Sequence, residues 1–272
     1  MKKPELKQVE AWAREIGKVV KEMQFEDLHT EHKSKADLVT RADRLSEAFL
    51  KGKVMQAFPD HSILAEESGQ QADNLEHQWF IDPLDGTLNY AHGLPVFAIS
   101  IAYAYKGELQ LSVIYDPSRD EMFSAELGKG AWLNGKPIRV SQIDRLIDAM
   151  LITGFRFHLL DTPQSNVDNF LNLSHVAQTV RRLGSAALDL AYVACGRVEG
   201  FWEISLFPWD AAAGILLIRE AGGIVEPIYE TKSLLEGAPS LLAANATLFE
   251  EIKKVLLTKE YQNGTRQDST HL

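Results

Sequence analysis

The chain has 272 residues, of which 45% are hydrophobic and 24% charged, a composition that is typical of a globular protein and excludes disorder, collagen and coiled coil. The 28 Lys and Arg against 38 Asp and Glu give a formal net charge of −10, which argues against nucleic acid as the main partner, although carboxylates that hold a divalent cation can still bring phosphate to one site. Because there is one cysteine, Cys195, and no apolar run long enough for a signal peptide or a membrane span, we expect a cytoplasmic protein with no disulfide and no membrane partner.

The hydrophobic periodicity changes twice along the chain. From Glu5 to about Phe58, apolar residues recur at three- and four-residue steps, which predicts two helices joined by a polar loop at 29–37. From Ser62 to about Val140, short apolar runs alternate with turn residues such as Lys106-Gly107, which predicts a meander of antiparallel strands.

From about Ala149 onward, the pattern alternates between strands and helices. We expect strands at 150–152, 201–204 and 224–226, and helices at 163–178, from Ser185 to Gly196 and at 209–220. The connections are short and no linker or repeat separates the zones. Residues 1–258 are therefore expected to form a single unit, with an α+β half at about 1–145, an α/β half at about 146–258 and a polar, flexible tail at 259–272.

The segment from Trp79 to Tyr90 carries the strongest chemical signal. An apolar strand runs into a turn with two carboxylates three residues apart, Asp82 and Asp85. With the Leu84 carbonyl they can converge on one hard cation, which prefers oxygen ligands. Thr87 stands where a helix could begin, and the free N–H groups there would receive an anion such as phosphate. Carboxylates for Mg²⁺ beside an amide pocket for phosphate are what metal-assisted phosphoester hydrolysis requires.

Each acidic segment, taken alone, also has a purely structural explanation. Asp-Pro and Asp-Gly pairs are common in β-turns. The pair Glu66-Glu67 could be a solvated loop, and Asp210, at a predicted helix start, could be an N-cap. The signal becomes specific only when the segments are taken together.

Five segments combine into a pattern: 37–43, Glu66-Glu67-Ser68, 79–89, Gly184-Ser185-Ala186-Ala187 and 209–214. In this order and spacing they resemble the inositol monophosphatase family of magnesium-dependent, lithium-sensitive phosphatases. The resemblance covers most of the chain, to about Gly223. It implies the α+β fold of inositol monophosphatase and fructose-1,6-bisphosphatase, a layered α-β-α-β-α sandwich that usually forms a homodimer.

The resemblance implies a cofactor of two to three Mg²⁺ ions per subunit. The implied ligands are Glu66, Asp82 and the Leu84 carbonyl for the first ion, and Asp82, Asp85 and Asp210 for the second. Asp43, near Glu66, would support a weaker third ion through waters.

The same resemblance assigns roles around the reacting phosphate. The implied catalytic residues are Glu66 and Thr87, which would orient the attacking water, Asp82, which bridges the ions, and Thr40, which would assist activation. The implied substrate contacts are Asp85, Gly86, Thr87, Gly184, Ser185, Ala186, Glu203 and Asp210. Gly86 and Thr87 would cradle the phosphate, and Glu203 with Ser185-Ala186 would contact the substrate's hydroxyls.

The implied reaction is Mg²⁺-dependent hydrolysis of inositol monophosphate or a related small sugar phosphate, by in-line attack of a metal-activated water. Related enzymes use NADP, adenosine 3′,5′-bisphosphate or fructose 1,6-bisphosphate, which remain alternatives. A second hypothesis is a non-catalytic member that binds a phosphorylated ligand or a partner protein and regulates it. The presence of every implied ligand carboxylate, together with Thr87, favours an active enzyme.

Overall fold

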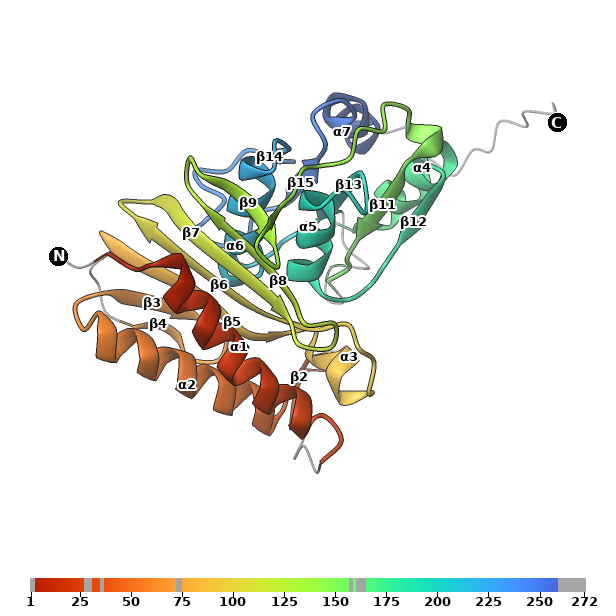
Figure 1. The fold of residues 1–272 in the computed structure, drawn as a ribbon. Helices are drawn as coiled ribbons and strands as arrows, with labels where there is room; N and C mark the ends of the chain where they lie inside the picture. Colours follow the sequence, from red (N-terminus) through yellow and green to blue (C-terminus); the bar gives the residue numbers. More distant parts are fainter. Residues whose placement is uncertain are drawn as a thin grey trace, which may run out of the picture.

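The computed structural model describes residues 3–26, 31–34, 37–71, 75–156, 159 and 165–258. They form five layers in the order α-β-α-β-α, which confirms the predicted sandwich (Figure 1). The helices are α1 (Leu6–Met23), α2 (Arg41–Ala57), α3 (Thr87–Ala91), α4 (Val167–Val176), α5 (Ala186–Ala194), α6 (Pro208–Glu220) and α7 (Phe249–Leu257). The strands are β1 (Glu31–Ser34), β2 (Asp37–Val39), β3 (Ser62–Ala65), β4 (Gly69–Gln71), β5 (His77–Asp85), β6 (Ala98–Tyr105), β7 (Glu108–Asp116), β8 (Glu121–Glu126), β9 (Gly130–Leu133), β10 (Lys136–Pro137), β11 (Met150–Thr153), β12 (Thr179–Arg181), β13 (Gly200–Glu203), β14 (Ile224–Pro227) and β15 (Leu241–Ala244).

The larger sheet has eight strands in the order β10-β9-β8-β7-β6-β5-β3-β4. Helices α1 and α2 cover one of its faces (Figure 1). The predicted Lys106-Gly107 hairpin joins β6 to β7, and both turn residues have positive φ. The prediction of an antiparallel meander from Ser62 to about Val140 was wrong for one pair, because β3 and β5 are parallel. The chain pairs β4 with the outer edge of β3 and then returns to the other edge, so β5 has the same direction as β3.

The polar loop predicted at 29–37 was also partly wrong. Strands β1 and β2 pair antiparallel in this segment, and residues 29, 30, 35 and 36 lie outside the described ranges. The sequence of β1, Glu-His-Lys-Ser, is polar throughout, so no hydrophobic alternation marks it as a strand.

The smaller sheet has five strands in the order β12-β11-β13-β15-β14. Helices α5 and α6 pack between the two sheets, and α4 and α7 cover the outer face (Figure 1). The helix predicted at 163–178 is α4, which is shorter than predicted; residues 163 and 164 and the predicted tail at 259–272 lie outside the described residues. No helix in the described ranges is both long and apolar enough to cross a membrane.

The end of β5 is shaped by a β-bulge. Asp82 pairs with Ser100 and Asp85 with Ala98, so β5 has one residue more than β6 over this stretch. The sequence predicted that the strand would end in a turn here, but the strand continues to Asp85. Pro83 is tolerated inside it because a bulge relieves one residue of its ladder hydrogen bond. Bulges change the direction of side chains, and this one lies in the segment that carries the two aspartates.

Helices α5 and α6 contact each other very closely at Gly214. A Cβ atom at this position would lie 2.4 Å from the Cβ of Leu190, which is fully buried on α5. We expect Gly214→Ala to lower the free energy of unfolding by about 1–3 kcal/mol, because neither helix can yield without repacking. Urea unfolding followed by circular dichroism measures this change.

The matched control is Gly52, an exposed position in α2 where an added Cβ atom would meet nothing within 4 Å. There the same substitution should raise stability by about 0.5–1 kcal/mol, since alanine loses less backbone entropy in a helix. Equal effects at the two positions would contradict the close α5–α6 contact.

Candidate active site

A cavity of about 910 Å³ lies where the end of β5 and the start of α3 meet α5, β13 and α6. All predicted site residues line it except Thr40 and Asp43. Those that line it are Glu66, Asp82, Leu84, Asp85, Gly86, Thr87, Gly184, Ser185, Ala186, Glu203 and Asp210. The fold therefore gathers acidic groups from the ends of β3, β5 and β13 and from the start of α6.

Asp82 is the most central of these carboxylates in electrostatic terms. It is 2% exposed, and the Leu84 N–H donates to its Oδ1 (3.0 Å). Burial raises the pKa of Asp82 well above its usual value, and the negative charges of Glu66, Asp85 and Asp210 raise it further. A cation beside this carboxylate would favour its ionised form and so lower its pKa.

Asp85 is anchored by the start of α5. Its Oδ2 accepts hydrogen bonds from the Ser185 hydroxyl (2.6 Å) and the Ala187 N–H (2.7 Å). Ser185 is the N-cap of α5, as predicted, so the cap residue also binds the carboxylate. Burial nevertheless raises the pKa of Asp85 to about 6, and the charge of Asp210 contributes to the increase.

The oxygens of Glu66, Asp82, Leu84, Asp85 and Asp210 form a donor set that suits a hard divalent cation, because Mg²⁺ prefers carboxylate and carbonyl ligands. The raised pKa of Asp82 fits this chemistry, since its neighbours add negative charge. Across the described ranges, no three acidic, histidine or cysteine side chains already stand in the arrangement of an assembled metal centre. The carboxylates would have to adjust in order to surround an ion.

Asp210 is held by a cation that the sequence motifs did not indicate. The Nη2 group of Arg156 donates to Asp210 Oδ2 (2.7 Å), and the Phe207 N–H donates to the same oxygen (3.0 Å). Asp210 is thus the third residue of α6 and not its N-cap. The Arg156 guanidinium lies 4.7 Å from the centroid of the Phe207 ring, and its Nε donates to the Ser205 carbonyl (2.9 Å). Arg156 and Asp210 belong to no common motif, so the sequence has no signal for this pair.

Thr40 and Asp43 lie behind Thr87, away from the cavity wall. The Thr40 hydroxyl and N–H both donate to Asp43 Oδ2 (2.5 and 2.8 Å), which also caps α2. Thr87 Oγ1 lies 2.8 Å from Asp43 Oδ1 and 2.9 Å from the Leu84 carbonyl oxygen. Burial raises the pKa of Asp43 despite these hydrogen bonds. Asp43 is therefore connected to the cavity through Thr87.

Two glycines allow the start of α3 to approach the loop before α5. Gly86 has φ 89°, and a Cβ there would lie 2.8 Å from the Val96 carbonyl oxygen. Gly184 has φ 86°, and a Cβ there would lie 3.1 Å from Asn89 Nδ2. The Asn89 amide donates to the carbonyls of Val96 (2.9 Å) and Leu183 (2.8 Å). Asn89 therefore joins the two predicted phosphate and substrate segments, a role that the sequence did not reveal.

Glu203 forms the opposite wall of the cavity. A Cβ at Gly154 would lie 2.0 Å from Glu203 Oε2, so the carboxylate occupies the space that this glycine leaves. Burial raises the pKa of Glu203 to about 8; the charge of Arg156 opposes this increase and that of Asp210 adds to it. Arg182 and Asp189 also line the cavity and were not predicted. Asp189 follows Ser185 by four residues, so helical periodicity could have placed it on the same face of α5.

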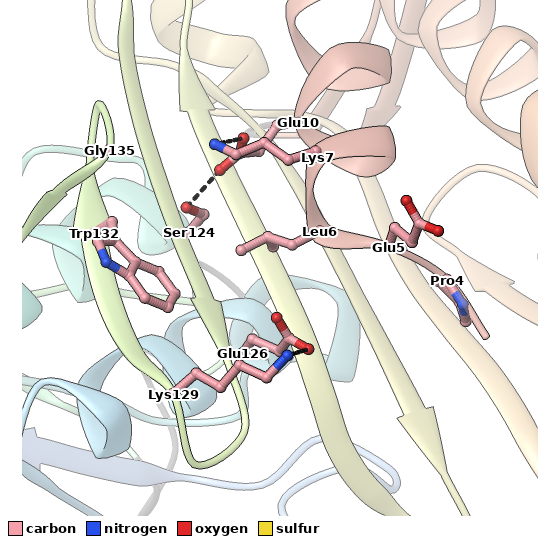
Figure 2. Close-up of a pocket in the computed structure, with 10 residues that line it drawn as sticks. All are labelled: Pro4, Glu5, Leu6, Lys7, Glu10, Ser124, Glu126, Lys129, Trp132 and Gly135. Atoms are coloured by element: carbon pink, nitrogen blue, oxygen red, sulfur yellow. Dashed lines mark hydrogen bonds and ion pairs between the residues drawn. The ribbon is translucent and has the colours of Figure 1, made fainter.

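A second, smaller cavity of about 480 Å³ lies between the start of α1 and strands β8 and β9 (Figure 2). It contains two ion pairs, Lys7 with Glu10 (2.8 Å) and Lys129 with Glu126 (2.5 Å). Glu10 also accepts a hydrogen bond from the Ser124 hydroxyl (2.8 Å). None of the predicted site residues lines it, so the larger cavity is the candidate active site.

The raised pKa of Glu203 predicts a pH-dependent change in stability. Between about pH 4.5 and 8 the folded protein holds a proton that the unfolded chain releases, so Glu203 lowers the free energy of unfolding increasingly as the pH rises through this range. In metal-free buffer, Glu203→Gln should therefore stabilise the protein at pH 9 by on the order of a few kcal/mol, and by much less at pH 5. Urea unfolding at both pH values measures the difference.

The control is Glu230→Gln, at an exposed position, which should leave stability unchanged at both pH values. A stabilisation by Glu203→Gln that is the same at pH 5 and pH 9 would show that Glu203 does not gain its proton in this range.

Known proteins resemble this chain along most of its length. An inositol-1-monophosphatase of Synechocystis is 46% identical over 81% of this chain and 77% of its own length. The Nus factor SuhB of Pseudomonas aeruginosa is also 46% identical, over 83% of each chain.

Solved structures resemble the fold equally well. The inositol monophosphatase from Anabaena superposes with a TM-score of 0.83 at 42% identity, covering 92% of this chain and 94% of its own. An IMPase/NADP phosphatase complexed with Mg²⁺ and phosphate has a TM-score of 0.81 at 27% identity, covering 93% and 94%. The family model described as the inositol monophosphatase family matches residues 1–264. The chain therefore belongs to the inositol monophosphatase family and is a phosphatase of that class.

Proposed function

We propose that this chain is a Mg²⁺-dependent phosphomonoesterase that hydrolyses inositol monophosphate or a related sugar phosphate. The observation that carries the proposal is that Glu66, Asp82, Asp85 and Asp210, from three separate segments, line one cavity, where burial and the charges of the other three raise the pKa of Asp82. The likeness to proteins named inositol-1-monophosphatase supports the substrate class. The likeness to an enzyme solved with Mg²⁺ and phosphate supports the cofactor.

The ligands proposed for the first ion are Glu66, Asp82 and the Leu84 carbonyl, and those for the second are Asp82, Asp85 and Asp210. Bound there, Mg²⁺ would lower the pKa of the attacking water and offset the charge that develops on the leaving oxygen. We do not extend the proposal to a third ion at Asp43, because that carboxylate is fully buried and is bonded to Thr40 and Thr87.

Thr87 would orient the attacking water. Its hydroxyl has one proton, which it can donate to Asp43 or to the Leu84 carbonyl, and its oxygen can still accept a hydrogen bond from a water in the cavity. Because burial raises the pKa of Asp43, its carboxylate is a better acceptor for a proton relayed through Thr87. Thr40 holds Asp43 in the orientation that this relay needs.

The substrate's hydroxyl-bearing part would lie between Glu203 and the start of α5, at Gly184, Ser185 and Ala186. The nucleotide-type alternative, NADP or adenosine 3′,5′-bisphosphate, and fructose 1,6-bisphosphate share one requirement, a second phosphate. Arg182, an exposed cation on the cavity wall, is the observation that favours such a substrate.

The name Nus factor, carried by several relatives, suggests a regulatory role as a second candidate for this chain. A protein that only bound a partner would gain nothing from several carboxylates in a cavity where burial raises their pKa. We therefore place hydrolysis first.

Glu66 and Glu67 offer a matched test of the proposal, because they are adjacent and both line the cavity. Glu66→Gln should lower kcat by about 100-fold or more with inositol 1-phosphate and Mg²⁺, because it removes a proposed ligand. EDTA should abolish the wild-type activity and added Mg²⁺ should restore it. Phosphate release measures both effects.

Glu67→Gln should retain kcat within about threefold, since its N–H, bonded to Glu47, is unaffected and it is not a proposed ligand. Equal losses in both variants, or activity that survives EDTA, would contradict the proposed ligand set.

A further inference from the structure

Asp189 is a buried carboxylate with no evident structural task. It lies in the first turn of α5, its side chain is 1% exposed, and it lines the cavity that holds the proposed ligands. Among the residues that the structure describes, its Oδ1 has no hydrogen-bond partner. Buried polar atoms are nearly always hydrogen-bonded, and an exception calls for a donor from elsewhere.

The charges around Asp189 do not explain its burial. Glu203 and Asp85, both negative, raise its pKa in addition to the main effect of burial, and only Arg182 opposes them. The other arginine of the cavity, Arg156, is engaged by Asp210. A carboxylate among carboxylates lowers the stability of the free protein, so its presence is better explained by something that enters the cavity.

The position of Asp189 on α5 shows what that ligand would be. Ser185, one helical turn earlier on the same face, donates to Asp85 and so ties this end of the helix to the proposed metal ligands. Asp189 therefore lies one helical turn further along α5 than the residue that binds Asp85. Glu203 comes from the end of β13 and lines the same cavity, in the space left by Gly154.

A carboxyl group can accept a hydrogen bond from a hydroxyl when ionised and donate one to it when protonated. Asp189 and Glu203 line the same cavity, so each can bond a hydroxyl group of one ligand there. We propose that Asp189, together with Glu203, binds hydroxyl groups of a polyhydroxylated leaving group, and that Asp189 is a specificity-determining residue for cyclitol or sugar phosphates. This inference rests on the proposed phosphatase function.

Asp189→Asn tests the inference, with inositol 1-phosphate compared with p-nitrophenyl phosphate, which has no hydroxyl on its leaving group. The variant should lose about tenfold or more in kcat/KM for inositol 1-phosphate, chiefly through KM, and change by less than about twofold for p-nitrophenyl phosphate. Its Tm in the free state should rise, because a buried unpaired carboxylate is replaced by a neutral amide. Asp168→Asn, in the first turn of α4 and outside the cavity, is the matched control. It should leave kcat/KM unchanged for both substrates.

Two outcomes would overturn the role of Asp189. Equal losses for both substrates would show that it acts on the phosphate or its ligands, and a fall in Tm with unchanged selectivity would show that it is structural.

Saturation-transfer NMR with free inositol separates this inference from the proposed function, because it needs no turnover. Wild-type signals that weaken in Asp189→Asn support the inference even if the wild type hydrolyses neither phosphate, which would refute only the proposed function. No signal from the wild type would overturn the inference itself.

Discussion

The constraint on which this structure depends is the cost of keeping several carboxylates inside one cavity. Asp82 and Asp85 both have their pKa raised by burial and by neighbouring negative charge. The fold offsets part of this cost with donors that it supplies locally, such as the Leu84 N–H for Asp82 and the Ser185 hydroxyl for Asp85. These donors offset only part of the cost of burying the carboxylates. Divalent cations, protons or the hydroxyls of a ligand can offset the rest. The remaining unfavourable electrostatic free energy of the cavity is relieved when a cation or ligand binds, and this relief contributes to the binding free energy.

The layered architecture is what allows such a cavity to form. The bulge at the end of β5 lies between the two aspartates and interrupts the regular ladder there, and α5 and α6 approach each other closely at Gly214, so that both helix starts line the same cavity. Strand β13 of the smaller sheet supplies Glu203 from the other side. These acidic groups therefore come from the ends of elements whose bodies are packed in the core.

The sequence predicted those parts of the fold and site whose signals are local. The Lys106-Gly107 hairpin, the Ser185 cap and the five layers were all predictable, the first two from turn and cap chemistry and the last from the resemblance. The parallel pairing of β3 with β5 was not, because it depends on which edge of β3 the returning chain joins. The arrangement of Arg156 against Asp210 was equally hidden, because two residues 54 positions apart share no motif and meet only in the folded protein.

The Arg156–Asp210 pair connects the proposed metal ligands with the side of the cavity that Glu203 forms. Arg156 binds Asp210 Oδ2, donates to the Ser205 carbonyl and lies over Phe207, whose ring stacks on Trp209 (centroids 4.7 Å apart). Oδ2 of Asp210, a proposed metal ligand, is therefore held by Arg156, which also contacts Ser205 and Phe207 in the segment that follows Glu203. Because a hydrogen-bonded carboxylate presents its other oxygen in a defined direction, a substrate that moves this segment would also move the ligand. The proposed metal ligand Asp210 and the segment that follows Glu203 thus share the Arg156 guanidinium and the stacked rings of Phe207 and Trp209.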